Sequence, residues 1–366
     1  MESQNEGHEA ATRRMLEAQT HGWNHVFSFI NSMSLRSAIE LNIPDIIHKH
    51  GKPMPIHLLA SSLQIQPSKT PHLRRLMRFL THTGFFSLQK PLETSDDPEG
   101  YILTNASTLF LKDHPFTLAP FIFLMLDPIL VKPWEHLPAW FQNNDPTPFE
   151  TASGKAFYDY AWIRNGPRTF NNFIDTLASD SKLVGKVLVE QCRDVFKGCG
   201  SLVDVGGNTG TMAKALAEAF PEMECTVFDL PSVVGGLKDC ENLKFVQGDM
   251  FQTIPPAADI IMSKWTLCDW DDERCLKLLK NFKEAVTSKG KRGKLVLINE
   301  VVEDGKADYD DESVETQLQF DLALMMWFPG KERNEKEWAH LFSSAGFTTY
   351  KITPVLGIRS LIEVFP

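Results

Sequence analysis

The stretch Leu202–Gly210, LVDVGGNTG, decides the fold of this chain. Its apolar start has the character of a short strand, it ends in a cluster of glycines, and the Ala-rich segment Thr211–Phe220 that follows has the character of a helix. A strand, a glycine turn and a helix open a Rossmann-type unit, in which bare backbone approaches a nucleotide-like ligand. Asp229 ends the next apolar segment, where a carboxylate can accept hydrogen bonds from a ribose diol. The sequence therefore predicts a nucleotide-type ligand at this turn.

The glycines do not follow the G-x-G-x-x-G pattern of NAD-binding units, because Asp204–Gly210 has the form D-x-G-G-x-x-G. Three more motifs follow in order: FDLP at Phe228–Pro231, GDMF at Gly248–Phe251 and KWTLCDW at Lys264–Trp270. Together the four motifs resemble those of plant type 1 O-methyltransferases, which use S-adenosylmethionine (SAM) to methylate hydroxyls of caffeate, flavonoids and alkaloids. The resemblance covers most of the chain, from about Phe27 onward.

Composition limits the possible partners of the chain. Its 366 residues give room for two domains, and 43% hydrophobic with 23% charged residues is the balance of a soluble globular protein. A net charge of −10 with scattered basic residues argues against nucleic acid and anionic membranes as partners. Met1–Arg14 is polar and does not resemble a signal peptide. We therefore expect a cytoplasmic protein.

The six cysteines form no CxxC pair and have no histidines at zinc spacing, so no metal site is expected. Cys192 and Cys199 could in principle form a disulfide, but reduced thiols fit a cytoplasmic protein better.

The N-terminal part of the chain has a different pattern from the rest. Residues 1–18 are polar and are expected to be frayed. Three helical segments follow, and then two short strands at 85–88 and 101–104, an arrangement that resembles a winged helix. Such modules often bind DNA, but this one lacks a basic cluster in its hairpin, and in the resembled family it is a dimerisation platform. We therefore expect a homodimer formed through this domain.

The rest of the chain predicts an α/β fold with a mostly parallel sheet. Strands alternate with helices from residue 198 onward, and ligands of such sheets bind at the carboxyl ends of the strands. The expected strands are 201–205, 224–228, 243–247, 258–263, 295–301, 348–352 and 360–365. The expected division is an N-terminal helical, winged-helix-like domain at 1–115, a helical substrate-pocket region at 116–195 and a Rossmann-like SAM-binding domain at 196–366.

The motifs assign a SAM site residue by residue. Gly206 and Gly207 leave room for the amino-acid tail of SAM, and Asp229 is the expected acceptor for its ribose diol. The resemblance implies that two polar residues address the adenine end and that two apolar ones pack the base; these are Asp249 with Lys264, and Leu230 with Met250. The simpler interpretations are that Asp249 only caps a helix and that Lys264 is a surface charge.

The position of the catalytic base departs from the family pattern. The resembled enzymes have a histidine there that removes the phenolic proton, and this chain has Cys268. A thiol has a pKa of about 8.5 and is mostly protonated at neutral pH, and a negative neighbour such as Asp269 would raise that pKa further. Glu300 and Glu332 match the two carboxylates that flank the missing histidine in the family.

The acceptor region also departs from the family. Ser153 replaces a pocket histidine, and Leu177 replaces a methionine that packs the acceptor ring. Aromatic and apolar side chains commonly line small-molecule pockets, although most such residues are ordinary core. The candidates for contact with a flat acceptor are Met125, Phe173, Leu177, Trp265, Met325 and Phe328.

These departures leave several functional hypotheses. The first is a SAM-dependent O-methyltransferase, yielding S-adenosylhomocysteine, whose acceptor hydroxyl is already acidic; the C-terminal segment 350–364 resembles the isoflavonoid and indole-alkaloid branch, which suggests an enolic alkaloid intermediate. The second is a phenol or flavonoid methyltransferase with another base, such as Cys268, Glu332 or His136. The third is a protein that binds SAM without methyl transfer, as a different catalyst or as a partner subunit.

Overall fold

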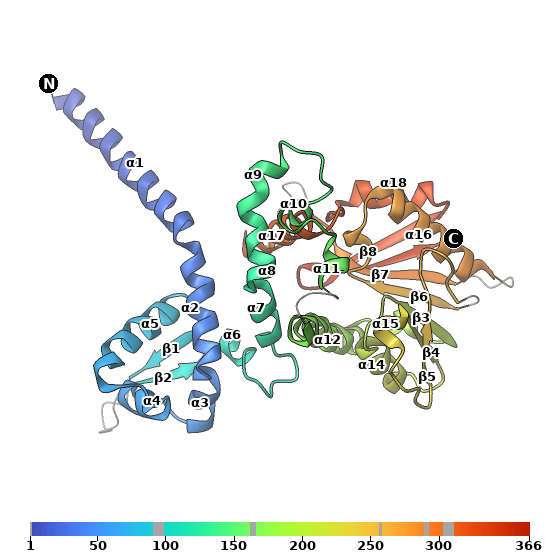
Figure 1. Ribbon diagram of the computed structural model, residues 1–366, viewed down its shortest axis with the longest axis horizontal. Coiled ribbons are helices and arrows are strands. Elements are labelled where there is room, and N and C mark those ends of the chain that lie inside the picture. The colour runs from blue at the N-terminus through green and yellow to red at the C-terminus, as the bar shows by residue number, and fades with distance from the viewer. Residues whose placement is uncertain (1, 91–98, 162–165, 256–257, 289–292, 303–310) are drawn as a thin grey trace. The chain divides into compact units, whose positions relative to one another are not determined.

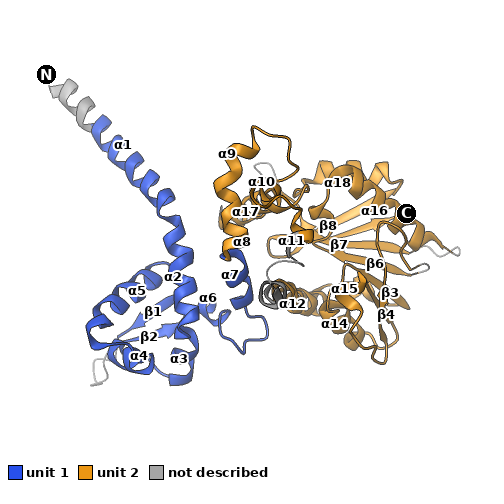
Figure 2. Ribbon diagram, in the orientation of Figure 1, with its two compact units in different colours: residues 1–126 blue, residues 127–366 orange. Residues whose placement is uncertain are grey.

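The computed structural model describes residues 2–90, 99–161, 166–255, 258–288, 293–302 and 311–366 (Figure 1). The chain divides into two compact units, residues 1–126 and 127–366 (Figure 2). The boundaries expected at residues 115 and 195 stay predictions.

Unit 1 is helical and contains one small antiparallel sheet. Its elements are α1 (Glu2–Val26), α2 (Ser28–Glu40), α3 (Ile43–His50), α4 (Ile56–Ser62), η1 (Pro67–Lys69), α5 (Thr70–His82), β1 (Phe86–Gln89), β2 (Gly100–Leu103), α6 (Asn105–Thr108) and α7 (Ala119–Met125).

The polar N-terminus is helical, so the expectation that residues 1–18 are frayed is wrong. Alanine and long straight side chains favour helix there, and Arg13 pairs with Glu17 one turn later. The core of unit 1 lies between α2, α5 and the hairpin, where Ala38, Met77 and Phe86 are buried.

Unit 2 contains the expected α/β architecture. Its elements are α8 (Pro128–Val131), η2 (Lys132–His136), α9 (Leu137–Trp140), α10 (Pro148–Ser153), α11 (Phe157–Ala161), α12 (Gly166–Gln191), α13 (Arg193–Phe196), β3 (Ser201–Val205), α14 (Thr211–Ala219), β4 (Glu224–Asp229), α15 (Pro231–Val234), β5 (Leu243–Gln247), β6 (Ile260–Lys264), η3 (Leu267–Asp269), α16 (Asp272–Thr287), β7 (Lys294–Glu300), α17 (Asp311–Trp327), α18 (Glu335–Ser344), β8 (Thr349–Leu356) and β9 (Arg359–Phe365).

One seven-stranded sheet organises unit 2, with the strand order β5-β4-β3-β6-β7-β9-β8. The first five strands of this order are parallel, and β9 is antiparallel to both of its neighbours. The order runs outward from β3 in two directions, which creates a switch point between β3 and β6. The expected α/β fold with a mostly parallel sheet is confirmed.

Helices cover both faces of the sheet, because its central strands are apolar on both sides. Ile261 packs toward α16 and α18, where Phe282 and Trp338 are buried. The preceding residue, Ile260, packs on the opposite face with Leu188 of α12. Figure 1 shows these helices above and below the strands.

Within the described ranges, no helix combines the length and the apolar character needed to cross a membrane. All six cysteines are free thiols, so Cys192 and Cys199 are not joined.

Candidate active site

The parallel strands bring the predicted SAM residues to one edge of the sheet. Gly206 follows β3, Asp229 ends β4, Asp249 follows β5 and Lys264 ends β6. Glu300 ends β7 at the same edge. Because the carboxyl ends of parallel strands share an edge, these residues surround the switch point between β3 and β6.

The glycine turn is closely fitted to the segment after β6. Gly206 has a φ of +73°, and a Cβ added there would lie 2.8 Å from Thr266 Oγ1. A side chain at this position would therefore be strained and would collide with its neighbour. Buried Asp204 fills the space beneath Gly207, where an added Cβ would lie 2.8 Å from the Asp204 carboxyl carbon. Burial raises the pKa of Asp204 to about 7.

Asp229 is anchored to the glycine turn by backbone amides. The Asn208 N–H donates to one of its carboxylate oxygens at 2.9 Å, and the Leu230 N–H donates to the other at 2.7 Å. Each oxygen keeps a further lone pair for a ligand hydroxyl. A bare-backbone turn beside an oriented carboxylate fits a ligand with a ribose diol.

The adenine end of the predicted site leaves two interpretations of Asp249. Its carboxylate accepts from the Phe251 N–H at 2.9 Å and from the Gln252 side chain at 3.1 Å, so it caps a local turn. A capping carboxylate can still accept a bond from a ligand. Leu230 is partly exposed and Met250 packs against the core, and their roles at the adenine stay predictions.

Lys264 is buried, so it is not a surface charge. Its ammonium pairs with Asp180 at 2.8 Å and lies 4.0 Å from the Trp265 ring centre. Arg359 pairs with the same carboxylate. Burial alone would raise the pKa of Asp180, but the two cations lower it. Sequence reasoning missed Asp180 and Arg359, because the contacts join α12, β6 and β9.

Trp265 carries backbone strain at the end of β6. Its φ is +51°, a region that large side chains rarely adopt, and its ring stacks on Phe320 of α17 at 5.7 Å. Such strain gathers at functional sites. Its predicted role in the acceptor pocket stays a prediction.

Cys268 lies in η3, and its side chain is buried. Burial raises the pKa of the thiol well above its ordinary value, and the nearby carboxyls of Glu332, Asp269 and Glu300 raise it further. The thiol is therefore protonated at neutral pH and is a very weak base.

Two buried glutamates, Glu300 and Glu332, lie near Cys268. Neither carboxyl oxygen of Glu300 has a hydrogen-bond partner among the described residues, and the same is true of Glu332 Oε2. Burial raises the pKa of Glu300 to about 8, and burial with the charge of Glu300 raises that of Glu332 well above its usual range. Burial therefore favours the protonated form of both carboxyls.

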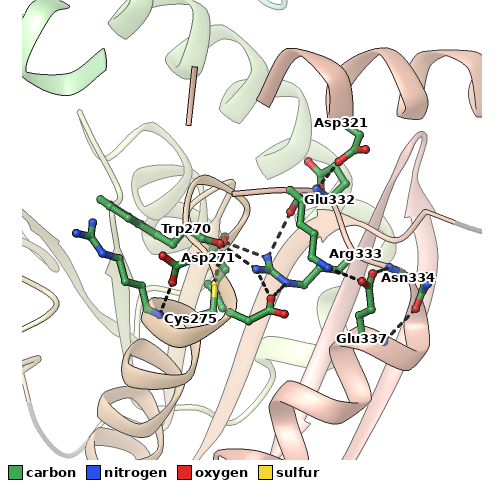
Figure 3. Close-up of polar contacts among 12 residues, drawn as sticks. Trp270, Asp271, Cys275, Asp321, Glu332, Arg333, Asn334 and Glu337 are labelled. Atoms are coloured by element: carbon green, nitrogen blue, oxygen red, sulfur yellow. Dashed lines mark hydrogen bonds and ion pairs between the residues drawn. The ribbon is translucent and has the colours of Figure 1, made fainter. Parts of the chain in front are cut away.

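Close backbone contact and hydrogen bonds hold the loop that carries Glu332 against η3 (Figure 3). A Cβ on Gly330 would lie 1.8 Å from the Cys268 carbonyl oxygen, so only glycine allows this approach. Fully buried Arg333 donates to the Trp270 carbonyl at 2.9 Å and pairs with Asp272 at 2.7 Å. These contacts hold Glu332 beside Cys268.

An aromatic cluster from several helices adjoins Asp269. Tyr158 of α11 donates to Asp269 at 2.6 Å, and its ring stacks on Trp270 with centroids 6.2 Å apart. Phe328 lies 5.2 Å from the same ring, so this predicted pocket residue belongs to the cluster. Nothing in the sequence indicated this contact, because Tyr158 and Asp269 come from elements that are distant in the chain.

The remaining pocket candidates are spread over several elements. Phe173 of α12 lies 6.0 Å from Phe157, and Leu177 and Met325 are partly buried on α12 and α17. Ser153 donates to the Lys155 carbonyl at 2.9 Å and so closes a local turn. Met125 ends α7 in unit 1, and its role stays a prediction.

Comparison with known proteins matches this arrangement to methyltransferases. An O-methyltransferase domain matches residues 134–348, and an O-methyltransferase dimerisation domain matches residues 23–113. Probable O-methyltransferase 3 of Humulus lupulus is 53% identical over 98% of this chain and 95% of its own length. Trans-resveratrol di-O-methyltransferase of Vitis vinifera is 51% identical over 96% of this chain and 97% of its own length.

Solved structures agree on the fold. Human N-acetylserotonin methyltransferase in complex with SAM superposes with a TM-score of 0.75 at 20% identity, over 95% of this chain and 97% of that one. CalO1, a methyltransferase of calicheamicin biosynthesis bound to S-adenosylhomocysteine, gives a TM-score of 0.78 at 20% identity, over 95% of this chain and 98% of that one.

The chain belongs to the plant type 1 O-methyltransferases, so the family suggested by its motifs is confirmed. It is a SAM-dependent enzyme, and its dimerisation domain supports a homodimer. The glycine turn with Asp229 fits the SAM it requires. Within the described residues, no group of three or more His, Cys, Asp or Glu side chains could hold a metal ion.

Proposed function

We propose that this enzyme methylates an acidic hydroxyl, such as the enol of a β-dicarbonyl, on a small plant metabolite such as an indole-alkaloid intermediate. The observation that carries the proposal is Cys268, a buried and protonated thiol at the position of the family's base. A phenol with a pKa of about 10 needs a strong base near neutral pH, whereas an acidic enol gives up its proton more easily.

In this proposal one group of residues binds SAM and another binds the acceptor. Gly206, Asp229, Asp249 and Lys264 would hold SAM, with Leu230 and Met250 packing its base. Bound SAM supplies a methyl group on a sulfonium. Aromatic side chains such as Phe173 and Phe328 would fix a flat acceptor, and holding the oxygen in line with the methyl group provides most of the acceleration. In this proposal the acceptor is a small molecule and the enzyme works in the cytoplasm.

A phenolic acceptor is the second candidate, and the named relatives favour it. Trans-resveratrol di-O-methyltransferase and the 8-hydroxyquercetin 8-O-methyltransferase of Mentha piperita, 49% identical to this chain, are named for phenolic compounds. Phenol methylation would need a base other than Cys268. Glu332 was one alternative, but burial raises the pKa of its carboxyl well above the usual range and so favours its protonated form.

A panel experiment separates these candidates. Purified protein is incubated with methyl-labelled SAM and with enolic alkaloid aldehydes, flavonoids or simple phenols, and labelled products are identified by mass spectrometry. We expect label on enolic acceptors. Label confined to phenols would establish the second candidate. SAM binding without label on any acceptor would point instead to a different catalyst or a partner subunit.

The variant Cys268→His tests the role of the missing imidazole. It should gain transfer to simple phenols, by the 10²- to 10⁴-fold that a placed general base typically contributes. Calorimetry of SAM binding is the control, because a misfolded site would lose SAM as well. If the variant binds SAM and gains no phenol activity, the missing base does not limit the acceptor range.

A further inference from the structure

A hydrogen-bonded pair lies next to the missing base. Tyr158 Oη donates to Asp269 Oδ2 at 2.6 Å, and the Cys268 thiol lies 3.8 Å from the other oxygen of the same carboxyl. The two partners come from α11 and η3, which are more than a hundred residues apart in the chain. Such a short contact is typical of a hydroxyl bound to a charged carboxylate.

Aromatic packing fixes the tyrosine in this position. Its ring stacks on Trp270 at an interplanar angle of 22°, and Phe157 and Phe328 contact it at 5.7 Å and 5.2 Å. Phe328 is also a predicted contact of the acceptor ring. The pair therefore joins the position of the lost base to the aromatic cluster.

We propose that Asp269 accepts the proton of the acceptor hydroxyl and that Tyr158 is the positioning residue that orients its carboxylate. This rests on the proposed function and deepens it, because it names the base that remains. Tyr158 occupies one lone pair of Oδ2, and among the described residues Oδ1 accepts from the weak thiol donor of Cys268. A lone pair is thus left for the acceptor.

The other acidic groups nearby are less suited to this role. Burial raises the pKa of Glu300 to about 8 and that of Glu332 well above its usual range, and the nearby carboxyl of Asp321 raises both further. Cys268 is a protonated thiol. Among these groups, Asp269 alone has a carboxyl oxygen that accepts a bond shorter than 3 Å from a described side chain.

The strength of this base matches an acidic acceptor. Burial raises the pKa of Asp269 to about 7, although the hydrogen bonds from Tyr158 and Cys268 lower it. The titratable group facing it from the loop before α18 is the carboxyl of Glu332. The pKa of a phenol, about 10, lies about three units above that of the Asp269 carboxyl. Proton transfer from a phenol to Asp269 is therefore unfavourable by a factor of about a thousand. The pair thus favours enols over simple phenols.

The proposed proton transfer needs no reactants beyond SAM and the acceptor. The acceptor O–H bond breaks and its proton moves to Asp269. The oxygen's electron pair forms the new bond to the methyl carbon, and the electrons of the old carbon–sulfur bond stay on sulfur, which gives S-adenosylhomocysteine. Asp269 then releases the proton to solvent.

The pH profile of kcat/KM is the first test, with an acceptor that the labelled panel shows to be methylated. The unaltered enzyme should gain activity as pH rises through about 7, because the ionised carboxylate is the active form. Tyr158→Phe should move this midpoint upward, because it removes a hydrogen bond that stabilises the carboxylate. The activity that Tyr158→Phe loses at pH 6 should return at higher pH. A variant with a structural defect would not recover in this way.

Two further variants complete the design. Asp269→Asn should lower kcat by about a hundredfold or more with SAM affinity retained. Tyr350→Phe is the matched control, because the Tyr350 hydroxyl also contacts a carboxyl, Glu335, at 3.3 Å on α18. The Tyr350→Phe variant should have the same pH profile of kcat/KM as the unaltered enzyme.

A measurement without SAM guards against variants that fold poorly. In protein labelled with ¹³C at aspartate carboxyls, the Asp269 resonance should titrate near pH 7 and move upward in Tyr158→Phe. An unchanged midpoint in that variant, or full turnover in Asp269→Asn, would overturn the inference. Failure of the proposed function gives a different result, because the unaltered enzyme would then methylate no enol in the labelled panel. The ¹³C titration of Asp269 would still show whether Tyr158 stabilises its carboxylate.

Discussion

At the residue scale, the buried thiol of Cys268 lies near two buried glutamates, Glu300 and Glu332. An imidazole has two ring nitrogens for neighbouring carboxyls, whereas a thiol is a single weak donor. Both carboxyl oxygens of Glu300, and Oε2 of Glu332, lack hydrogen-bond partners among the described residues. Their raised pKa values follow from this burial. Burial therefore favours the neutral form of both glutamates beside the Cys268 thiol.

Asp249→Asn separates the two interpretations of this residue. An asparagine oxygen can still accept from the Phe251 N–H, so the turn and the free energy of unfolding should change by less than about 0.5 kcal/mol. Loss of the negative charge should weaken SAM binding at least about tenfold, measured by calorimetry.

Asp229→Asn is the positive control for this experiment, because that carboxylate is the expected acceptor for the ribose diol. Unchanged SAM affinity in Asp249→Asn, with weakened binding in Asp229→Asn, would leave Asp249 as a cap alone.

At the element scale, the loop at 328–334 and η3 behave as one structural piece. Gly330 allows their backbones to touch, and Arg333 ties the Leu267 and Trp270 carbonyls to the start of α16. Glu332 is positioned through these contacts. The loop is short, and its geometry depends on elements that are distant in sequence.

Arg333→Ala should destabilise the protein by about 3 kcal/mol, because it leaves buried carbonyls without their donor. Denaturant unfolding measures the loss. Arg274→Ala is a matched control, since this exposed arginine lies over the Trp270 ring and should cost about 1 kcal/mol or less. Equal losses in the two variants would contradict the anchoring role of Arg333.

The elements with strong periodicity could be predicted from the sequence, and the contacts between them could not. The strands at β3 and β5 begin and end where the apolar segments predict. β6 starts two residues later than expected, and the Asp259 carboxylate just before it accepts from the Gly200 N–H. The positions of Asp229 and Cys268 followed from motifs. The Asp269–Tyr158 and Lys264–Asp180 pairs depend on tertiary packing, which no local pattern encodes.

At the scale of the whole molecule, buried acids link folding to pH. The pKa values of Asp204 and Asp269 are raised to about 7, and that of Glu300 to about 8, each chiefly by burial. In the unfolded chain these groups ionise near pH 4. Between these limits the folded state holds more protons, so stability falls as pH rises. Asp180 and Glu337 have lowered pKa values and act in the opposite sense at more acidic pH.

The free energy of unfolding should therefore fall by about 1 kcal/mol or more per pH unit between pH 5.5 and 7.5. Denaturant titrations at several pH values measure it. Asp204→Asn should flatten the decline, because it removes one of the proton-binding groups. A stability that rises over this range would show that these carboxyls are ionised in the folded protein.

The glutamate oxygens that lack hydrogen-bond partners among the described residues also make this site a locally frustrated region of the fold. A polar group buried without a partner lowers stability, and proteins keep such groups where a function requires them. Neutral or apolar replacements of Glu300 are thus a route to a more heat-resistant protein. A selection of random variants for thermal stability should recover substitutions at Glu300 and Glu332. The activity that each variant loses would measure what these two residues contribute to catalysis.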